Sequence, residues 1–216
     1  MKTLLCFGDS NTHGTVPMQS ADEVVRHGFA QRWPGVLRSA LGANWCVVEE
    51  GLPGRTTSFD DPDEGDDRNA RRYWQACLQS HRPLDAIVIM LGTNDLKAKF
   101  GASPQTVAEA LGHLIDIARL NTPPQSAHPL MLLVAPVPIL ELSFFRDVFA
   151  GGASKSRQLA ATYARVAAQR GVHFLDAAAH CSVSTIDGIH LDGLAHQQLG
   201  AAIASALITS ARIDLS

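Results

Sequence analysis

The chain has 216 residues, of which 46% are hydrophobic and 18% charged, a composition typical of one globular domain over residues 1–216. Lys and Arg number 18 against 21 Asp and Glu, which gives a formal net charge of -3. A balance this close to neutral excludes the clustered basic surface of nucleic-acid-binding proteins. The longest apolar runs are too short for a membrane span or a signal-peptide core, so we expect a cytoplasmic protein without a membrane partner.

The residues that most often bind metals show no metal-site spacing. The four cysteines form no C-x-x-C pair, and the histidines form no H-E-x-x-H motif. An acidic run over residues 60–67 fails the calcium-loop template, because Gly65 stands where a ligand is required. We therefore expect no metal and no organic cofactor, and we interpret the acidic run as a solvated loop.

Five short apolar segments have the length of β-strands, at residues 3–7, 45–49, 85–91, 130–135 and 172–175. The third is apolar at consecutive positions, as a strand covered on both faces must be. Helical spacing of apolar residues lies between the segments, over 33–41, after Ser103-Pro104, over 154–170 and from Asp192 onward. This alternation predicts a three-layer, flavodoxin-like α/β sandwich of about five parallel strands with helices on both faces.

Polar residues follow several of these strands directly, and the ends of parallel strands meet at the edge of the sheet where ligands bind. Ser10 comes just after the first strand, and Asp187 and His190 lie three residues apart before the last helix. A serine hydroxyl becomes a nucleophile when an imidazole takes its proton, and a carboxylate fixes the tautomer of that imidazole. The sequence therefore predicts a catalytic triad of Ser10, His190 and Asp187.

Such a nucleophile also needs hydrogen-bond donors for the oxyanion that forms when it attacks a carbonyl. The candidates are the backbone N–H groups of Ser10 and Gly54 and the side-chain amide of Asn94. We assign Asp9 to hydrogen bonds that support the Ser10 loop. Each residue taken alone is also common in turns or helix caps, so the prediction depends on their joint occurrence at strand ends.

The sequence resembles the SGNH, or GDSL-type, hydrolase superfamily in four blocks that follow the family order over nearly the whole chain: Gly8-Asp9-Ser10, Gly54, Gly92-Thr93-Asn94-Asp95 and Asp187-Gly188-Ile189-His190. The resemblance implies Ser10 as nucleophile, His190 as base oriented by Asp187, and Gly54 and Asn94 as oxyanion donors together with the Ser10 amide. Three longer stretches are similar to the bacterial aryl esterase and acyltransferase branch: Leu-Cys-Phe-Gly-Asp-Ser, Glu-Glu-Gly-Leu-Pro-Gly-Arg-Thr-Thr and Ile-Met-Leu-Gly-Thr-Asn-Asp-Leu-Lys.

Two positions next to the nucleophile depart from this resemblance. Asn11 stands where the family name has leucine, and His13 stands where the aryl esterase branch often carries tryptophan. No catalytic role is assigned to the Asn11 side chain, whereas His13 is expected to alter the pocket wall. We place both residues in the substrate pocket, together with Thr93 and Ile189.

Three connections, at residues 11–32, 55–72 and 137–153, are longer than an α/β unit needs. The third is rich in apolar residues, so we expect it to cover the pocket or to pack against another subunit. The family resemblance also implies a homo-oligomer, with an octamer as one arrangement. Arg55 and Lys97 lie near the proposed site, and we interpret both as solvated surface residues.

The function expected from these features is hydrolysis of small aryl or short-chain acyl esters through an acyl-enzyme, with acyl transfer to alcohols as a related activity. Two alternatives keep the same site: a carbohydrate O-deacetylase, and a thioesterase or lysophospholipase. A third is a non-catalytic, flavodoxin-like binding module. Against the binding module, the sequence lacks both G-x-x-x-x-G-K-[ST] and G-x-G-x-x-G phosphate-binding motifs.

Overall fold

The structure of the protein, a computed structural model, describes residues 1–210, so the last six residues of the predicted domain lie outside the described part. Its centre is a five-stranded parallel sheet in the order β2-β1-β3-β4-β5. This arrangement confirms the predicted parallel sheet. The strands are β1 (Lys2–Gly8), β2 (Trp45–Gly51), β3 (Ala86–Met90), β4 (Leu130–Ala135) and β5 (His173–Asp176).

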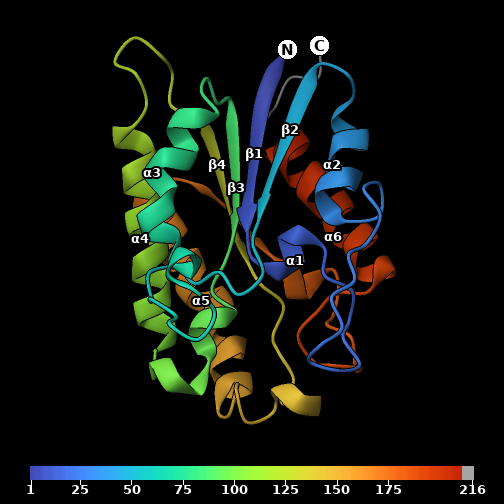
Figure 1. The fold of residues 1–216 in the computed structure, drawn as a ribbon. Helices are drawn as coiled ribbons and strands as arrows, with labels where there is room; N and C mark the ends of the chain where they lie inside the picture. Colours follow the sequence, from blue (N-terminus) through green and yellow to red (C-terminus); the bar gives the residue numbers. More distant parts are fainter. Residues whose placement is uncertain (211–216) are drawn as a thin grey trace.

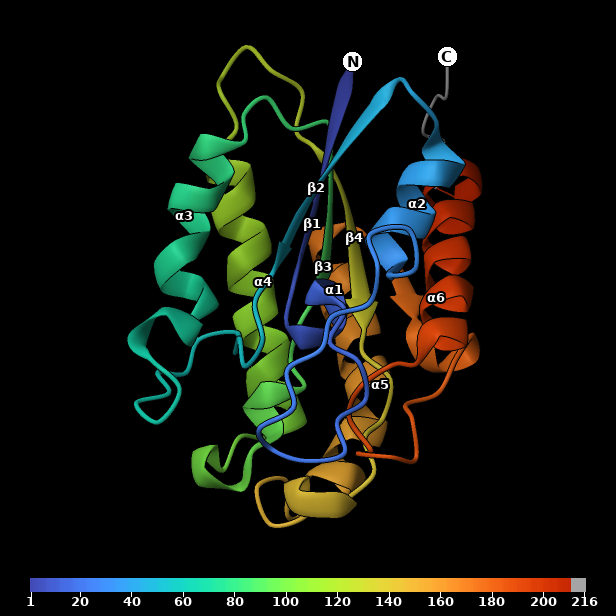
Figure 2. The same ribbon diagram turned by 45° about the vertical axis from the view of Figure 1, so that its right-hand side comes forward.

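Helices cover both faces of the sheet, as the three-layer prediction requires. Helices α3, α4 and α5 pack on one face, and α2 and α6 pack against each other on the opposite face (Figures 1 and 2). The helices are α1 (Ser10–His13), α2 (Trp33–Leu41), α3 (Ala70–Ser80), α4 (Pro104–Leu120), α5 (Gly152–Arg170) and α6 (Gly193–Ser205), which continues into a π-helical turn, Ala206–Ser210. Short 3-10 turns lie at Asp66–Arg68, Asn94–Leu96, Ala98–Phe100, Ser143–Phe145 and Ala177–Ala179.

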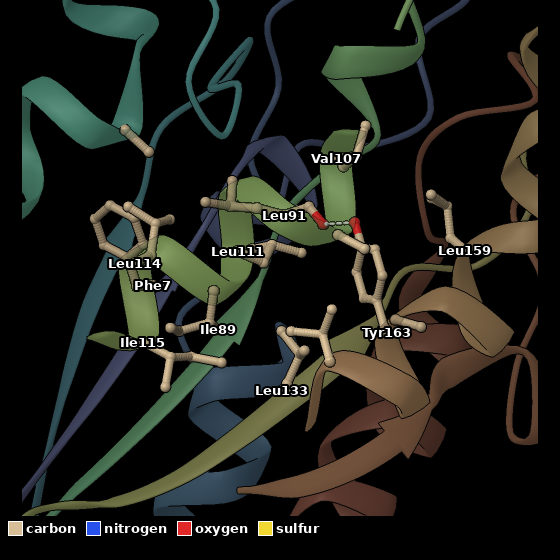
Figure 3. Close-up of a cluster of buried hydrophobic side chains, with 14 of the residues drawn as sticks. Phe7, Ile89, Leu91, Val107, Leu111, Leu114, Ile115, Leu133, Leu159 and Tyr163 are labelled. Carbon is tan, nitrogen blue, oxygen red and sulfur yellow. Dashed lines mark hydrogen bonds between the residues drawn. The ribbon is translucent and has the colours of Figure 1, made fainter. Parts of the chain in front are cut away.

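The core on the α3–α4–α5 side interlocks strand and helix side chains. Phe7 and Ile89 of the central strands belong to one buried cluster with Leu111 of α4 and Tyr163 of α5 (Figure 3). The Tyr163 hydroxyl donates a hydrogen bond to the Leu91 carbonyl at 2.9 Å, which satisfies the one polar atom of that ring. Burying each large apolar side chain here contributes about 1.5–3 kcal/mol, so the sheet provides a rigid base for its loops.

Capping side chains stabilise the first turns of α4 and α6. Ser103 accepts the N–H of Thr106 at 3.1 Å at the start of α4, and Asp192 accepts the N–H of Ala195 at 2.8 Å before α6. Helix α3 is an addition to the predicted elements, and it buries its apolar side chains at helical spacing. No helix within residues 1–210 combines the length and apolar character that crossing a bilayer requires.

Candidate active site

The nucleophile candidate, Ser10, sits at the carboxyl end of β1 as the first residue of α1 (Figure 1). Asp9 caps this short helix, because its carboxylate accepts the N–H of Asn11 at 3.0 Å. The predicted supporting role of Asp9 is therefore confirmed. Gly8 is required just before the turn, since a Cβ there would lie 2.0 Å from the Oγ1 of Thr12. The sharp exit from the strand leaves the Ser10 hydroxyl at the edge of the sheet.

The structure brings the three predicted triad residues together in one hydrogen-bonded chain. His190 Nε2 lies 3.1 Å from Ser10 Oγ, and His190 Nδ1 lies 2.7 Å from Asp187 Oδ2. Ser10 and His190 are almost completely buried, and Asp187 is fully buried. These contacts give a nucleophile, a base and an orienting carboxylate in the order that serine catalysis requires.

The Asp187 carboxylate is held by its neighbours in the ionised form. Its Oδ1 accepts the N–H groups of Ile189 and His190, each at 2.9 Å, and its Oδ2 also accepts the N–H of Met18 at 2.8 Å. Burial by itself would raise the pKa of Asp187, but the hydrogen bond and charge of His190 outweigh burial and lower it. An ionised Asp187 favours the tautomer with a proton on Nδ1, which leaves Nε2 free to accept the proton of Ser10.

The three predicted oxyanion donors also line the cavity next to Ser10. Gly54 has φ +78°, a left-handed backbone conformation that favours glycine over residues with a Cβ. Asn94 Nδ2 donates to the Arg55 carbonyl at 3.1 Å, and this bond orients the amide while leaving its second N–H unused. The backbone N–H groups of Ser10 and Gly54 have no hydrogen-bond acceptor within residues 1–210.

The cavity has a volume of about 240 Å³ and is lined by apolar and by charged side chains, which we call the apolar wall and the charged wall. The connections at 11–32 and 137–153 supply most of the apolar wall, so the prediction that the apolar connection covers a pocket is confirmed. The apolar wall consists of Met18, Val24, Phe145, Val148, Phe149 and Ile189, and the charged wall consists of Glu23, Glu64 and Lys97.

Of the four residues predicted to line the substrate pocket, the structure places Ile189 in its wall but not Asn11, His13 or Thr93. The amide of Asn11 is bound to the backbone on either side of His190. His13 is the last residue of α1, its backbone lies against Gly51 at the end of β2, and its ring contacts the Thr15 hydroxyl at 3.4 Å. Thr93 is buried at the start of the Asn94–Leu96 turn.

The expectation of a solvated Arg55 is wrong, because this residue is only 3% exposed. Its guanidinium donates to the carbonyl of Gly8 at 2.8 Å and to the carbonyl of Glu50, and it lies 4.2 Å from the centre of the Phe7 ring. Arg55, which directly follows Gly54, therefore links the end of β1 to the end of β2 by hydrogen bonds.

Lys97 was also expected at the surface, and it is only 4% exposed. Its ammonium pairs with Asp61 at 3.0 Å and with Glu64. Asp61 is fully buried and pairs with Lys99 as well, and Lys99 also pairs with Asp63. Three members of the acidic run, Asp61, Asp63 and Glu64, are therefore part of an ion-pair network rather than a solvated loop. Local sequence patterns give no indication of this network, since each of these ion pairs joins residues more than 30 positions apart.

One group of potential metal ligands lies away from the triad, on β2 and α3. The ligand atoms of Glu50, Cys77 and His81 lie within 4.8 Å of one another. His81 already contacts Glu50 at 2.8 Å, and burial together with the charge of Glu50 raises the pKa of the Cys77 thiol to about 12. The His81–Glu50 contact joins the end of α3 to β2, so we interpret this group as structural.

Comparison with known proteins gives a consistent set of matches. A family model described as GDSL-like Lipase/Acylhydrolase family matches residues 6–198. The structure matches the carbohydrate acetylesterase Est24 from Sinorhizobium meliloti with a TM-score of 0.91 and 37% identity, over 99% of this chain and 100% of that one. It matches the M. smegmatis aryl esterase with a TM-score of 0.91 and 37% identity, over 96% of this chain and 98% of that one.

A curated relative is also detected by sequence, the uncharacterized lipoprotein YqeF from Bacillus subtilis. It is 27% identical over 138 residues, which cover 62% of this chain and 49% of the relative. The chain therefore spans about half the length of the curated relative that it matches.

Proposed function

The chain belongs to the GDSL-like lipase/acylhydrolase family, and we propose that it is a serine esterase that hydrolyses small acyl esters through an acyl-enzyme. The observation that carries this proposal is the hydrogen-bonded chain from Ser10 through His190 to Asp187, at 3.1 and 2.7 Å. It opens into a cavity that Gly54 and Asn94 also line. A nucleophile, its base and its oxyanion donors thus share one enclosed space.

In the acylation half-reaction, His190 Nε2 takes the proton of Ser10 as the hydroxyl oxygen attacks the ester carbonyl. The negative charge that develops on the carbonyl oxygen is stabilised by the N–H groups of Ser10 and Gly54 and by the Asn94 amide. The imidazolium is stabilised by Asp187. When the tetrahedral intermediate collapses, the ester C–O bond breaks and His190 returns the proton to the departing alcohol or phenol.

Deacylation repeats these steps with water as the nucleophile. His190 takes a proton from water, the hydroxide attacks the acyl-enzyme carbonyl, and Ser10 leaves with the proton returned by His190. An alcohol in place of water would give acyl transfer by the same route. All of these steps use side chains and backbone groups of this chain.

The size of the cavity supports small substrates. Its volume of about 240 Å³ lies below the range of about 300–1,000 Å³ typical of sites for drug-sized ligands. Phe145 and Phe149 from the 137–153 connection limit the apolar side. This wall favours acetyl and other short acyl groups over the long chains of a lysophospholipase or thioesterase substrate.

A second candidate is de-esterification of an acetylated carbohydrate, which the charged wall favours. Glu23 and Glu64 offer carboxylate acceptors and Lys97 offers an ammonium donor, which are groups that bind sugar hydroxyls. The structurally similar Est24 is described as a carbohydrate acetylesterase. A Glu64→Gln variant distinguishes the two substrates, because it should lower kcat/KM for an acetylated sugar more than for p-nitrophenyl acetate.

We also propose that the chain forms a homo-oligomer through the connections around the cavity. Val24 and Val148 line the cavity and are 80% and 42% exposed, which places apolar surface at its mouth. Light scattering would test this directly. A purely monomeric species would overturn it without affecting the esterase proposal.

The test of the esterase proposal is hydrolysis of p-nitrophenyl esters from acetate to a long acyl chain by the wild type and by Ser10→Ala. We expect serine-dependent activity that is highest on the shortest esters. Ser39→Ala is a matched control, because its hydroxyl bonds only to the Gly35 carbonyl within α2. Substantial activity in purified Ser10→Ala would overturn the proposal, and a preference for long chains would keep the triad but reject the small-substrate assignment.

A further inference from the structure

The side chain of Asn11 joins the segment that carries Ser10 to the loop that carries His190. Its Nδ2 donates to the Ile189 carbonyl at 3.1 Å, and its Oδ1 accepts the N–H of Leu191 at 3.0 Å. Asn11 is 6% exposed, and both of its partner residues are buried. The two hydrogen bonds therefore hold the backbone on both sides of His190 in an environment with little access to water.

These bonds take the place of a regular element, because residues 184–191 form turns rather than a helix or a strand. Among residues 1–210, the backbone of His190 is bound only within its own loop, to the Asp187 carboxylate at 2.9 Å and to the N–H of Ser184 at 2.8 Å. In a parallel sheet, a neighbouring strand bonds the C=O before a residue and the N–H after it. The Asn11 amide makes this pair of bonds around His190.

Asn11 is also placed to act on the distance between nucleophile and base. Between residues 9–13 and 184–191 the structure describes three hydrogen bonds: the Ser10–His190 contact and the two bonds of Asn11. The Ser10–His190 contact joins residues 180 positions apart, and Asn11 directly follows Ser10 in the chain. A shift of the His190 loop away from Ser10 would have to break the Asn11 bonds first.

We propose that Asn11 is a positioning residue that sets the distance and orientation of His190 relative to Ser10. This inference rests on the proposed function. Leucine, which the family name has at this position, is of similar size and makes neither hydrogen bond. Its introduction would leave a buried carbonyl and a buried N–H without their partner, and the His190 loop would relax to satisfy them elsewhere.

The direct test compares the wild type with Asn11→Leu in hydrolysis of p-nitrophenyl acetate. We expect kcat to fall by about ten- to a hundredfold, which corresponds to the loss of two buried hydrogen bonds, while KM changes by no more than about twofold. Asn121→Leu is the matched control: Asn121 also donates to a backbone carbonyl, that of Ile117 at 2.9 Å, but at the far end of α4. Its kcat should remain at the wild-type value.

A double-mutant cycle separates positioning from a general structural role. If Asn11 acts through His190, Asn11→Leu should have no further effect on the residual kcat of a His190→Ala variant. A residue that only stabilises the fold would lower the rate by the same factor in both backgrounds. Equal factors in the two backgrounds would overturn the inference.

The remaining outcomes separate this inference from the proposed function. An unchanged kcat in Asn11→Leu, with Ser10→Ala inactive, would overturn the role of Asn11 and leave the esterase intact. Activity in Ser10→Ala would overturn the esterase itself. If Asn11→Leu fails to fold, Asn11→Asp keeps the acceptor for Leu191 and removes the donor to Ile189, and we expect its kcat to fall by about tenfold. An unchanged kcat in that variant would also overturn the inference.

Discussion

Two regions at the carboxyl end of the sheet each contain a carboxylate that is fully buried, yet the pKa values of the two carboxylates are shifted in opposite directions. In the loop before α6, Asp187 lies against the imidazole of His190, and its pKa is lowered. In the turn after β3, Asp95 accepts hydrogen bonds from the N–H and hydroxyl of Thr57. Burial raises the pKa of Asp95 to about 6, because these neutral donors offset only part of the desolvation penalty.

The difference shows that burial alone does not determine the charge of a carboxylate in this site. A partner that can become a cation keeps Asp187 ionised, and this favours the orientation and tautomer of His190 that accept a proton from Ser10. Within the described part of the chain Asp95 has no such partner, and it instead fixes the position of Thr57, three residues after Gly54. One region is therefore suited to catalysis and the other to support of the oxyanion loop.

The largest expected difference between the two regions appears when each carboxylate is replaced by its neutral amide. Asp187→Asn should lower kcat by a factor of about 10⁴, because the amide favours the wrong tautomer of His190. Asp95→Asn should change kcat by no more than about threefold, because an amide oxygen still accepts a hydrogen bond from Thr57. Steady-state hydrolysis of p-nitrophenyl acetate measures both, and similar losses in the two variants would contradict the division of roles.

The sequence was sufficient to predict the framework of this region. Strand ends in a parallel sheet converge on one edge, so the positions of Ser10 and Asn94 followed from where the apolar runs stop. The Asp187–His190 pair was predicted from its three-residue spacing in the loop before the last helix. The observed distances of 3.1 and 2.7 Å between the triad side chains agree with that geometry. Residue type and order along the chain carried most of this information.

The same reasoning missed contacts that depend on long-range packing. Arg55 and Lys97 were assigned to solvent because isolated charges are usually exposed, and the structure buries both. The partners of Lys97 are about 35 residues away, and those of Asn11 are about 180 away, so no local periodicity reveals them. A buried polar side chain is predictable only once its partner is known.

The oxyanion side of the comparison can be tested at Asn94. Asn94→Ala should lower kcat by about 10²–10³-fold, because the oxyanion loses a preorganised donor, while KM changes little. Asn121→Ala serves as the control, since Asn121 caps the end of α4 far from the cavity. A wild-type kcat in Asn94→Ala would remove Asn94 from the oxyanion hole and leave the two backbone donors.

A third buried carboxylate, Asp61, extends the comparison to a site where the partners, Lys97 and Lys99, are permanent cations. Lys97 is 4% exposed and contacts both Asp61 and Glu64. Lys97→Met should lower the free energy of unfolding by about 3 kcal/mol, since it leaves Asp61 with only the partly exposed Lys99. Glu64→Gln should cost no more than about 1 kcal/mol, because the Glu64 side chain is 40% exposed.

Urea denaturation of the three proteins measures these differences. Equal destabilisation by Lys97→Met and Glu64→Gln would show that the buried pair with Asp61 contributes no more than the exposed pair with Glu64. A loss confined to Lys97→Met would identify Asp61 as the partner that makes the lysine necessary.

The effect most specific to the two original regions is the pH dependence of stability. The folded state raises the pKa of Asp95 to about 6, so between about pH 4 and pH 6 it binds more protons there than the unfolded state does. The contribution of Asp95 to stability therefore decreases as the pH rises through this range. Asp9 reinforces the trend, because burial also raises its pKa to about 6.

Asp187 acts in the opposite direction, since its pKa is lowered in the folded state. Its contribution is present above the usual carboxyl range and is lost as the pH falls toward the lowered pKa. Urea denaturation from about pH 3 to pH 7 measures both contributions. The wild type should lose stability relative to Asp95→Asn as the pH rises from about 4 to about 6. It should gain stability relative to Asp187→Asn as the pH rises from the acid end of the range. If the stability differences from the two variants changed in the same direction with pH, the hydrogen bond to His190 would not explain why the pKa values of Asp187 and Asp95 shift in opposite directions.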